Sequence, residues 1–271
     1  MERMIQLTNG ATAKLIAPND AEKEKYILYL HGGGFVYGSK ADFPQILESL
    51  FLKHGFTVIT LDYLLSPNSP LAEIVAELAA SFTELQTKVI KEAEFLFCGR
   101  SAGGYLMQLL TAQLLKNRQT PAGLINFYGY YDLAFVENPQ KLAPQTITAE
   151  EIKGIDQKDP IWDDPQLSRY LLYLYAVQHR SLLRYYGITA ENRGRFELTA
   201  EELKKFPPVF SSASSTDEEV PFKYSKTLAK LNKAGTFKPV YYLPHDFLKE
   251  ESDPSVLQVI EALGDWLEDF D

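Results

Sequence analysis

The feature that most constrains the fold of this 271-residue chain is a short apolar run, residues 95–98, that ends in Gly99-Arg-Ser101-Ala-Gly103. A helical pattern of apolar residues follows at once, over residues 101–117. Glycines allow the close backbone approach that a sharp turn between a strand and a helix requires. The pattern therefore predicts a buried strand, a tight turn and a helix, with Ser101 presented on the turn as a candidate nucleophile.

A second apolar run, residues 26–31, leads directly into Gly32, Gly33 and Gly34. Acyl transfer needs a nucleophile, and it also needs donors that stabilise the negative charge developing on the carbonyl oxygen. The two glycine-rich motifs supply one of these requirements each. Together they favour acyl-transfer chemistry based on Ser101.

Strand-like apolar runs alternate with helical patterns along most of the chain. We expect strands over residues 26–31, 57–62, 95–98, 123–128, 208–212 and 238–243, and helices over 42–54, 71–91, 101–117, 221–233 and 254–270. This alternation indicates an α/β fold, in which a mostly parallel central sheet carries helices on both faces. Residues 11–17 are expected to add an antiparallel edge strand.

One segment interrupts the alternation. Residues 132–206 show no convincing strand pattern, and residues 166–186 read as one long helix rich in tyrosine. A segment of this length is too long for a simple connection between two strands. We therefore predict a helical cap insertion at 132–206, late in the sheet and over the end that carries Ser101, with the α/β core formed by 1–131 and 207–271.

A serine nucleophile needs a base, and the chain has four histidines. His31 stands in the glycine loop, where backbone hydrogen bonding is the simpler role. His54 lies at the end of a predicted helix, and His179 lies within the cap as a packed or surface residue. His245 follows the last predicted strand, where a parallel sheet places reactive side chains. We predict that His245 is the base.

The base needs a carboxylate that orients the imidazole and stabilises its cation. Asp217 is the best candidate, because it lies in the loop after the penultimate strand. An aspartate at that place is also a normal helix cap, and the two roles are compatible. Glu218 is the fallback, whereas Asp246 is too close to His245 in sequence to orient it easily.

These motifs resemble those of the hormone-sensitive-lipase-like carboxylesterases, a branch of the α/β-hydrolase superfamily. The matching stretches are His31-Gly-Gly-Gly34-Phe, Gly99-Arg-Ser101-Ala-Gly-Gly104, Leu61-Asp-Tyr63-Leu-Leu-Ser-Pro67 and His245-Asp-Phe247. The order of Ser101, Asp217 and His245 along the chain is also that of α/β-hydrolases. The resemblance implies an α/β-hydrolase fold for the core.

The resemblance further implies that backbone N–H groups of Gly33, Gly34 and Ala102 form an oxyanion hole. Two positions depart from the family pattern: Arg100 stands where these esterases usually carry an acid, and Leu64 replaces an arginine. Neither departure removes a catalytic group. Both bear on the shape of the substrate pocket.

The activity implied is hydrolysis of short-chain carboxylic esters, small-molecule substrates, through an acyl-enzyme. Phe35, Tyr131 and Tyr170 are expected to contact the substrate. An amidase such as an arylformamidase, or an aminopeptidase-like hydrolase, is the alternative on the same fold. A non-catalytic ligand-binding homologue is a remote one. No metal or other cofactor is expected, because the acidic clusters lack metal-ligand spacing.

Composition and sequence pattern disfavour several other classes of protein. The net charge of −9 disfavours a nucleic-acid-binding surface. No apolar run reaches the roughly 18 residues that suggest a membrane span, and the N-terminus lacks the pattern of a signal peptide. The single cysteine, Cys98, is expected to be buried and inert. A cytoplasmic protein is the simplest interpretation, and a homodimer is left open.

Overall fold

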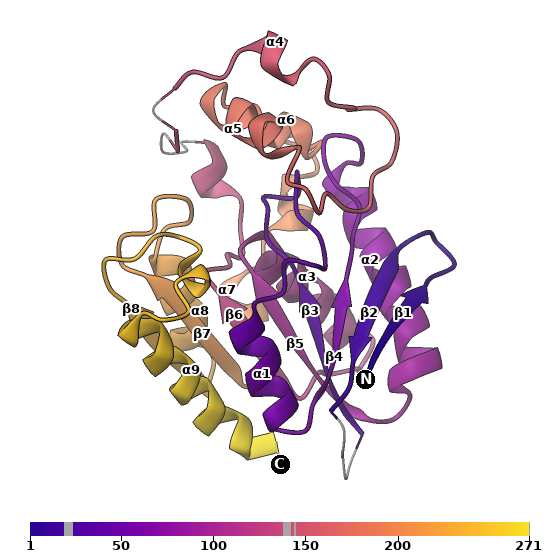
Figure 1. The fold of residues 1–271 in the computed structure, drawn as a ribbon, viewed down its shortest axis with the longest axis vertical. Coiled ribbons are helices and arrows are strands. Elements are labelled where there is room, and N and C mark those ends of the chain that lie inside the picture. The colour runs from indigo at the N-terminus through magenta and orange to yellow at the C-terminus, as the bar shows by residue number, and fades with distance from the viewer. Residues whose placement is uncertain (19–23, 138–141, 144, 271) are drawn as a thin grey trace.

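A computed structural model describes residues 1–18, 24–137, 142, 143 and 145–270. In these residues it shows an eight-stranded sheet in the order β1-β2-β4-β3-β5-β6-β7-β8 (Figure 1). The six strands from β4 to β8 in this order are parallel, and β1 and β2 are antiparallel to their neighbours. The strands are β1 (Glu2–Gln6), β2 (Thr12–Ile16), β3 (Lys25–Leu30), β4 (Thr57–Leu61), β5 (Glu94–Arg100), β6 (Gly123–Phe127), β7 (Val209–Ser214) and β8 (Gly235–Val240).

The predicted strands all form, with two corrections. The strand predicted at 11–17 is antiparallel but lies inside the sheet, because β1 pairs with its outer side and forms the edge. β1 is largely exposed and therefore lacks the apolar signal of a buried strand. β8 begins three residues before the predicted start and ends at Val240. The prediction ran past Val240 because Tyr241 and Tyr242 extend the apolar pattern in the sequence, although both are exposed.

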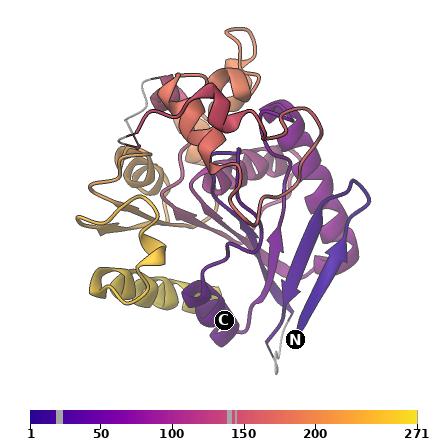
Figure 2. The same cartoon turned by 45° about the horizontal axis from the view of Figure 1, so that its top comes forward.

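Helices cover both faces of the sheet, as predicted. The main helices are α1 (Gln45–Lys53), α2 (Leu71–Leu85), α3 (Ala102–Lys116), α8 (Lys223–Leu231) and α9 (Pro254–Leu267). α1 and α9 lie on one face, and α2, α3 and α8 lie on the other (Figures 1 and 2). Shorter turns, η1 (Gln86–Ile90), η4 (Phe247–Lys249) and η5 (Glu268–Phe270), follow α2, β8 and α9.

Alternate side chains of β5 supply the two hydrophobic cores. Phe95 and Phe97 point into the core under α2 and α3, while Leu96 and Cys98 point into the core under α1 and α9. A strand buried on both faces reads as a continuous apolar run, which is why β5 is clear in the sequence. Burial also raises the pKa of the Cys98 thiol, as expected for an inert cysteine.

The segment between β6 and β7 carries short helices, several of which lie above the sheet, whereas the last one packs against α8 (Figures 1 and 2). They are η2 (Ala134–Glu137), α4 (Ala149–Ile152), α5 (Tyr170–Gln178), α6 (Leu182–Tyr185), η3 (Arg193–Phe196) and α7 (Ala200–Leu203). In the described part of this segment the one β contact is an isolated bridge between Gly38 and Asp164. The single helix predicted over 166–186 is wrong: the chain turns at Arg180, whose φ is +49°, and divides it into α5 and α6.

Among the described residues, the helices are too short or too polar to cross a membrane.

Candidate active site

Ser101 lies on the sharp turn between β5 and α3. Its φ of +49° is unusual for a residue with a side chain, and the turn depends on the glycines around it. A Cβ on Gly99 would lie 2.5 Å from the carbonyl oxygen of Gly103, and one on Gly103 would lie 2.2 Å from that of Leu30. The predicted strand, turn and helix are therefore present, and they aim Ser101 away from the sheet.

His245 and Asp217 meet Ser101 from the neighbouring loops. Nε2 of His245 lies 2.9 Å from Oγ of Ser101, and Nδ1 lies 2.6 Å from Oδ2 of Asp217. Asp217 follows β7 and His245 follows β8, so the parallel order of β5, β6, β7 and β8 brings the three loops to one end of the sheet. The serine hydroxyl can donate to Nε2 while Nδ1–H donates to the carboxylate.

Asp217 uses its two carboxylate oxygens differently. Oδ1 accepts hydrogen bonds from the backbone N–H groups of Glu219, at 2.9 Å, and Val220, at 2.8 Å. Oδ2 faces His245. Asp217 is not the cap of α8, which begins at Lys223, but it does order the loop. The helix-cap role considered from the sequence is therefore not observed, and Asp217 instead holds the turn that precedes α8.

The environment of His245 favours its protonated form. Burial by itself lowers the pKa of the imidazole, but the Asp217 carboxylate outweighs that effect, with further contributions from Glu219 and Asp246. The net result is a pKa above the ordinary value of 6.5. A histidine in this setting can accept a proton from Ser101 and hold it as a stabilised cation.

The other three histidines lie in different surroundings. His31 is buried, and its ring stacks on that of Tyr63 with 4.1 Å between the ring centroids. Its Nδ1 lies 2.7 Å from the carbonyl oxygen of Gly32. Burial lowers the pKa of His31 to about 4, so this imidazole is neutral near pH 7. His54 follows the last residue of α1, and His179 is exposed at the end of α5. The structure therefore brings His245, and none of these three, to Ser101.

The glycine loop after β3 approaches the same site. Gly33 and Gly34 have φ values of +102° and +57°. A Cβ on Gly33 would lie 2.0 Å from the carbonyl oxygen of Tyr37, and one on Gly34 would lie 2.4 Å from the ring of Tyr173. Only glycine fits without displacement, so the loop can pass close beside Ser101.

A cavity of about 350 Å³ opens in front of Ser101. It is lined by Gly32, Gly33, Gly34, Tyr37, Asp42, Arg100, Ser101, Tyr128, Leu167, Tyr170, Glu219, His245, Asp246 and Lys249. Of the three residues expected to contact the substrate, only Tyr170 is in this lining. Tyr131 instead packs edge-on against Tyr224, with 4.9 Å between ring centroids.

The structure corrects the expectation that Phe35 contacts the substrate. Its side chain turns into the core, where it is fully buried against the rings of Tyr105, Tyr130 and Tyr186. Phe35 therefore anchors the glycine loop to the hydrophobic core and does not line the cavity.

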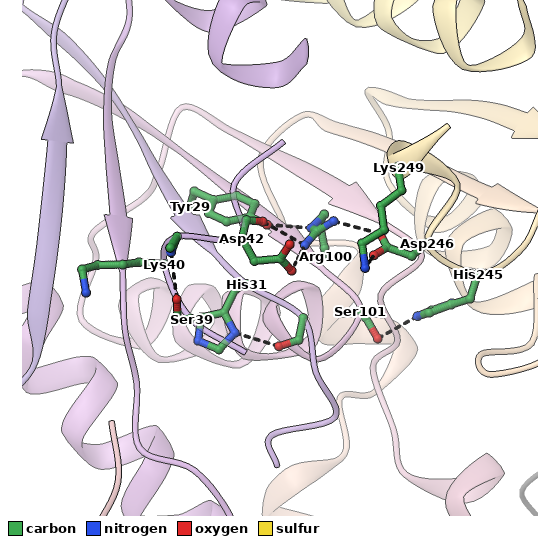
Figure 3. A network of polar contacts seen from close by, with 12 residues as sticks. Tyr29, His31, Ser39, Lys40, Asp42, Arg100, Ser101, His245, Asp246 and Lys249 are labelled. Atoms are coloured by element: carbon green, nitrogen blue, oxygen red, sulfur yellow. Dashed lines mark hydrogen bonds and ion pairs between the residues drawn. The ribbon is translucent and has the colours of Figure 1, made fainter. Parts of the chain in front are cut away.

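One wall of the cavity is charged, a feature that the sequence did not predict. Arg100, only 2% exposed, directs its guanidinium at three partners (Figure 3). Nε lies 2.6 Å from the hydroxyl of Tyr29, and Nη1 lies 2.8 Å from Oδ1 of Asp246. Nη2 donates to the backbone oxygen of Asp42 at 2.9 Å and also pairs with its carboxylate. The unusual arginine before Ser101 was the only signal in the sequence.

Asp246 joins this wall to the histidine loop. Its Oδ1 also accepts a hydrogen bond from the hydroxyl of Tyr128 at 2.6 Å, and Oδ2 pairs with Lys249 at 2.9 Å. Burial raises the pKa of the Asp246 carboxyl, but Arg100 and Lys249 outweigh burial and lower it to about 2. Asp246 is therefore ionised at neutral pH, and its oxygens are engaged by Arg100, Tyr128 and Lys249, whereas Nδ1 of His245 faces Asp217.

Among the described residues, no group of three or more histidine, cysteine or acidic side chains is placed to hold a metal ion.

Comparisons with known proteins agree with this architecture. A family model described as alpha/beta hydrolase fold matches residues 27–248. The crystal structure of an alpha/beta hydrolase superfamily protein from Enterococcus faecalis is similar with a TM-score of 0.97, at 48% identity over 99% of both chains. An esterase from the bacterial hormone-sensitive lipase family shares the fold at 20% identity, with a TM-score of 0.69 over 98% of this chain and 83% of that one.

A curated relative is similar over a shorter stretch. The protein named "Putative acetyl-hydrolase LipR" of Mycobacterium tuberculosis is 30% identical over 127 residues. The match spans 46% of this chain and 41% of that protein. The fold class predicted from the sequence is confirmed by these similarities.

Proposed function

The chain belongs to the α/β-hydrolase family, and from that premise we propose that it is a serine carboxylesterase acting on short-chain esters. The resemblance to the hormone-sensitive-lipase-like branch, seen first in the motifs, is supported by the shared fold. The observation that carries the proposal is the alignment of Ser101, His245 and Asp217, at 2.9 Å and 2.6 Å.

In the proposed mechanism Ser101 attacks the carbonyl carbon of the ester while His245 takes its proton. The resulting tetrahedral intermediate collapses as His245 protonates the leaving alcohol, and the acyl group remains on Ser101. Water, deprotonated by His245, then attacks the acyl-enzyme, and His245 returns the proton to Oγ of Ser101 as the acid is released. Asp217 holds the imidazole and stabilises its cation in both halves.

The backbone N–H groups of Gly33, Gly34 and Ala102 would stabilise the oxyanion. Two observations support this role: Gly33 and Gly34 line the cavity beside Ser101, and Ala102 is the first residue of α3. N–H groups in the first turn of a helix have no partner within the helix and favour negative charge. Donors fixed in this way before the reaction can supply several kcal/mol, about 3 for each donor.

The substrate class follows from the cavity. A volume of about 350 Å³ suits a small ester, and polar and charged groups of the lining disfavour a long acyl chain. The names of the similar proteins, an esterase and an acetyl-hydrolase, point the same way. Leu167 and Tyr170 come from the segment 132–206, so we keep the proposal that this segment is a cap that shapes the pocket.

Hydrolysis of p-nitrophenyl acetate, butyrate, octanoate and palmitate tests the proposal. We expect the wild type to hydrolyse the acetate and butyrate, and the Ser101→Ala and His245→Ala variants to lose that activity. His179→Ala is the matched control, because this histidine is exposed. Turnover of no ester by folded wild type would contradict the proposal, and the same assays with aryl formamides and aminoacyl amides would then decide for the amidase or aminopeptidase alternative.

A further inference from the structure

We propose that Arg100 and Asp246 form a clamp that positions His245, so that Arg100 acts on the reaction through Asp246 and not by touching substrate. The inference rests on the proposed function of His245 as the base. Arg100 directly precedes the nucleophile in the chain, and Asp246 directly follows the histidine. Their ion pair therefore joins the two loops that must keep Ser101 and His245 in register.

The contacts around Asp246 fix the histidine loop on two sides. Oδ1 of Asp246 accepts from Nη1 of Arg100 at 2.8 Å and from the hydroxyl of Tyr128 at 2.6 Å. The ring of Tyr128 also packs edge-on against the imidazole of His245, with 4.6 Å between centroids. One carboxylate oxygen therefore holds both the loop that carries His245 and the aromatic ring that packs against it.

Arg100 is itself held rigidly. Its remaining donors reach the hydroxyl of Tyr29, which lies in β3, and the backbone and side chain of Asp42 (Figure 3). A buried guanidinium is stable only while its charge and hydrogen bonds are matched, so Arg100 cannot move independently of these partners. With its donors so engaged, the guanidinium is suited to holding the loop and poorly suited to binding a ligand.

The sequence context agrees with the pairing. Arg100 departs from the motif that this chain resembles, in which an acid usually precedes the serine. The structure shows that Arg100 pairs with Asp246, the residue directly after His245.

The clamp also balances charge near the base. The charged groups facing His245 and its loop are the carboxylates of Asp217, Glu219 and Asp246, the cations Arg100 and Lys249 that pair with Asp246, and the Asp42 carboxylate that pairs with Arg100 in the same cavity. Tyr128 adds an uncharged hydroxyl. Loss of the Asp246 charge should therefore lower the pKa of His245, whereas loss of the Arg100 charge should raise it. These shifts of opposite sign report how close the two charges lie to the imidazole, whereas kcat in a charge-neutral variant that keeps the hydrogen bonds reports its position.

Two substitutions of Asp246 distinguish its effect on the position of His245 from the effect of its charge. Asp246→Ala removes the acceptor and the charge, and we expect kcat on p-nitrophenyl acetate to fall about 10- to 100-fold with a smaller change in KM. Asp246→Asn keeps an acceptor for Arg100 and Tyr128, so kcat at the pH plateau should recover to within about threefold of wild type. In both variants the titration of the His245 imidazole, followed by NMR, should move to lower pH.

Arg100 variants provide the complementary test. Arg100→Lys keeps the charge but not the planar fork of donors, so kcat should fall while His245 titrates near its wild-type pH. Arg100→Gln should move that titration to higher pH. Glu201→Gln is the matched control, since it removes an exposed carboxylate outside the cavity lining and should change neither readout. If the Arg100 variants do not fold, the Asp246 pair decides.

The outcomes keep the two proposals apart. Failure of the wild type to hydrolyse any ester overturns the proposed function, whereas the NMR titration reports on the clamp without any turnover. The clamp is overturned if folded Asp246→Ala titrates His245 at the wild-type pH, or if it retains the kcat of an active wild type.

Discussion

The imidazole of His245 and the carboxylate of Asp217 lie 2.6 Å apart, and the aspartate is held at its other oxygen by two backbone N–H groups. Because these N–H groups belong to Glu219 and Val220, the loop itself aims Oδ2 at the histidine. The Asp217 side chain is fully buried, so water does not compete for this contact. Replacing Asp217 by asparagine therefore removes the carboxylate charge with little change in the shape of the site.

Asp217→Asn should lower kcat about 10⁴-fold with little change in KM, because an amide at this position stabilises the wrong tautomer of His245 and cannot support its cation. The measurement is steady-state kinetics on p-nitrophenyl acetate. Glu218→Gln is the control, since Glu218 is exposed beside Asp217 and should keep nearly full activity. A larger loss in Glu218→Gln than in Asp217→Asn would reassign the acid.

The pH dependence of kcat/KM should show a single acid limb with its midpoint above 6.5, because the base must be neutral and the surrounding carboxylates raise the pKa of His245. Activity is therefore lost as the pH falls through the raised pKa and is full above it. His31, whose pKa is lowered to about 4, should not contribute to this limb. A midpoint at or below 6.5 in the wild type would contradict the assignment of charges around the base.

Gly34→Ala should lower kcat/KM about tenfold or more, because the new Cβ would lie 2.4 Å from the ring of Tyr173 and push the glycine loop from its place. If this contact is the cause, Gly34→Ala combined with Tyr173→Leu should recover part of the loss, measured against Tyr173→Leu alone in a double-mutant cycle. Strict additivity of the two changes would show that the ring is not the obstacle.

The sequence identified the parts of this molecule that carry a local signal. The glycine loop is marked by glycines with positive φ, and Ser101 by glycines at which a Cβ would collide with neighbouring backbone; the strands around them are buried on both faces. His245 and Asp217 could be chosen because a parallel sheet brings the loops after its strands to one end. Fold class and the grouping of these residues were therefore accessible from chain order and residue type.

What the sequence could not show depends on contacts between distant segments. The partners of Arg100 come from positions 29, 42 and 246, and no periodicity connects them. Phe35 stands next to the glycine loop but turns into the core, because its neighbours in space are Tyr105, Tyr130 and Tyr186. The break between α5 and α6 falls at Arg180, where no glycine or proline marks a turn.

Arg169, which is 3% exposed, links segment 132–206 to the core. Its guanidinium donates to the backbone oxygens of Val36, at 2.8 Å, and Ser66, at 2.9 Å, and to the side chain of Asn68 at 2.6 Å. A further donor reaches the backbone oxygen of Asp156 at 2.7 Å. One side chain thus ties the segment to the glycine loop and to the loop before α2.

Arg169→Met should lower the free energy of unfolding by about 3 kcal/mol, because the thioether fills the space but leaves several buried oxygens without donors. Chemical denaturation measures this loss, and Arg184→Met, which changes an exposed arginine of α6, should shift stability by no more than about 0.5 kcal/mol. Because Tyr170 follows Arg169 and lines the cavity while Ser101 and His245 are untouched, KM should rise more than kcat falls. Unchanged stability in folded Arg169→Met would show that other contacts hold the segment in place.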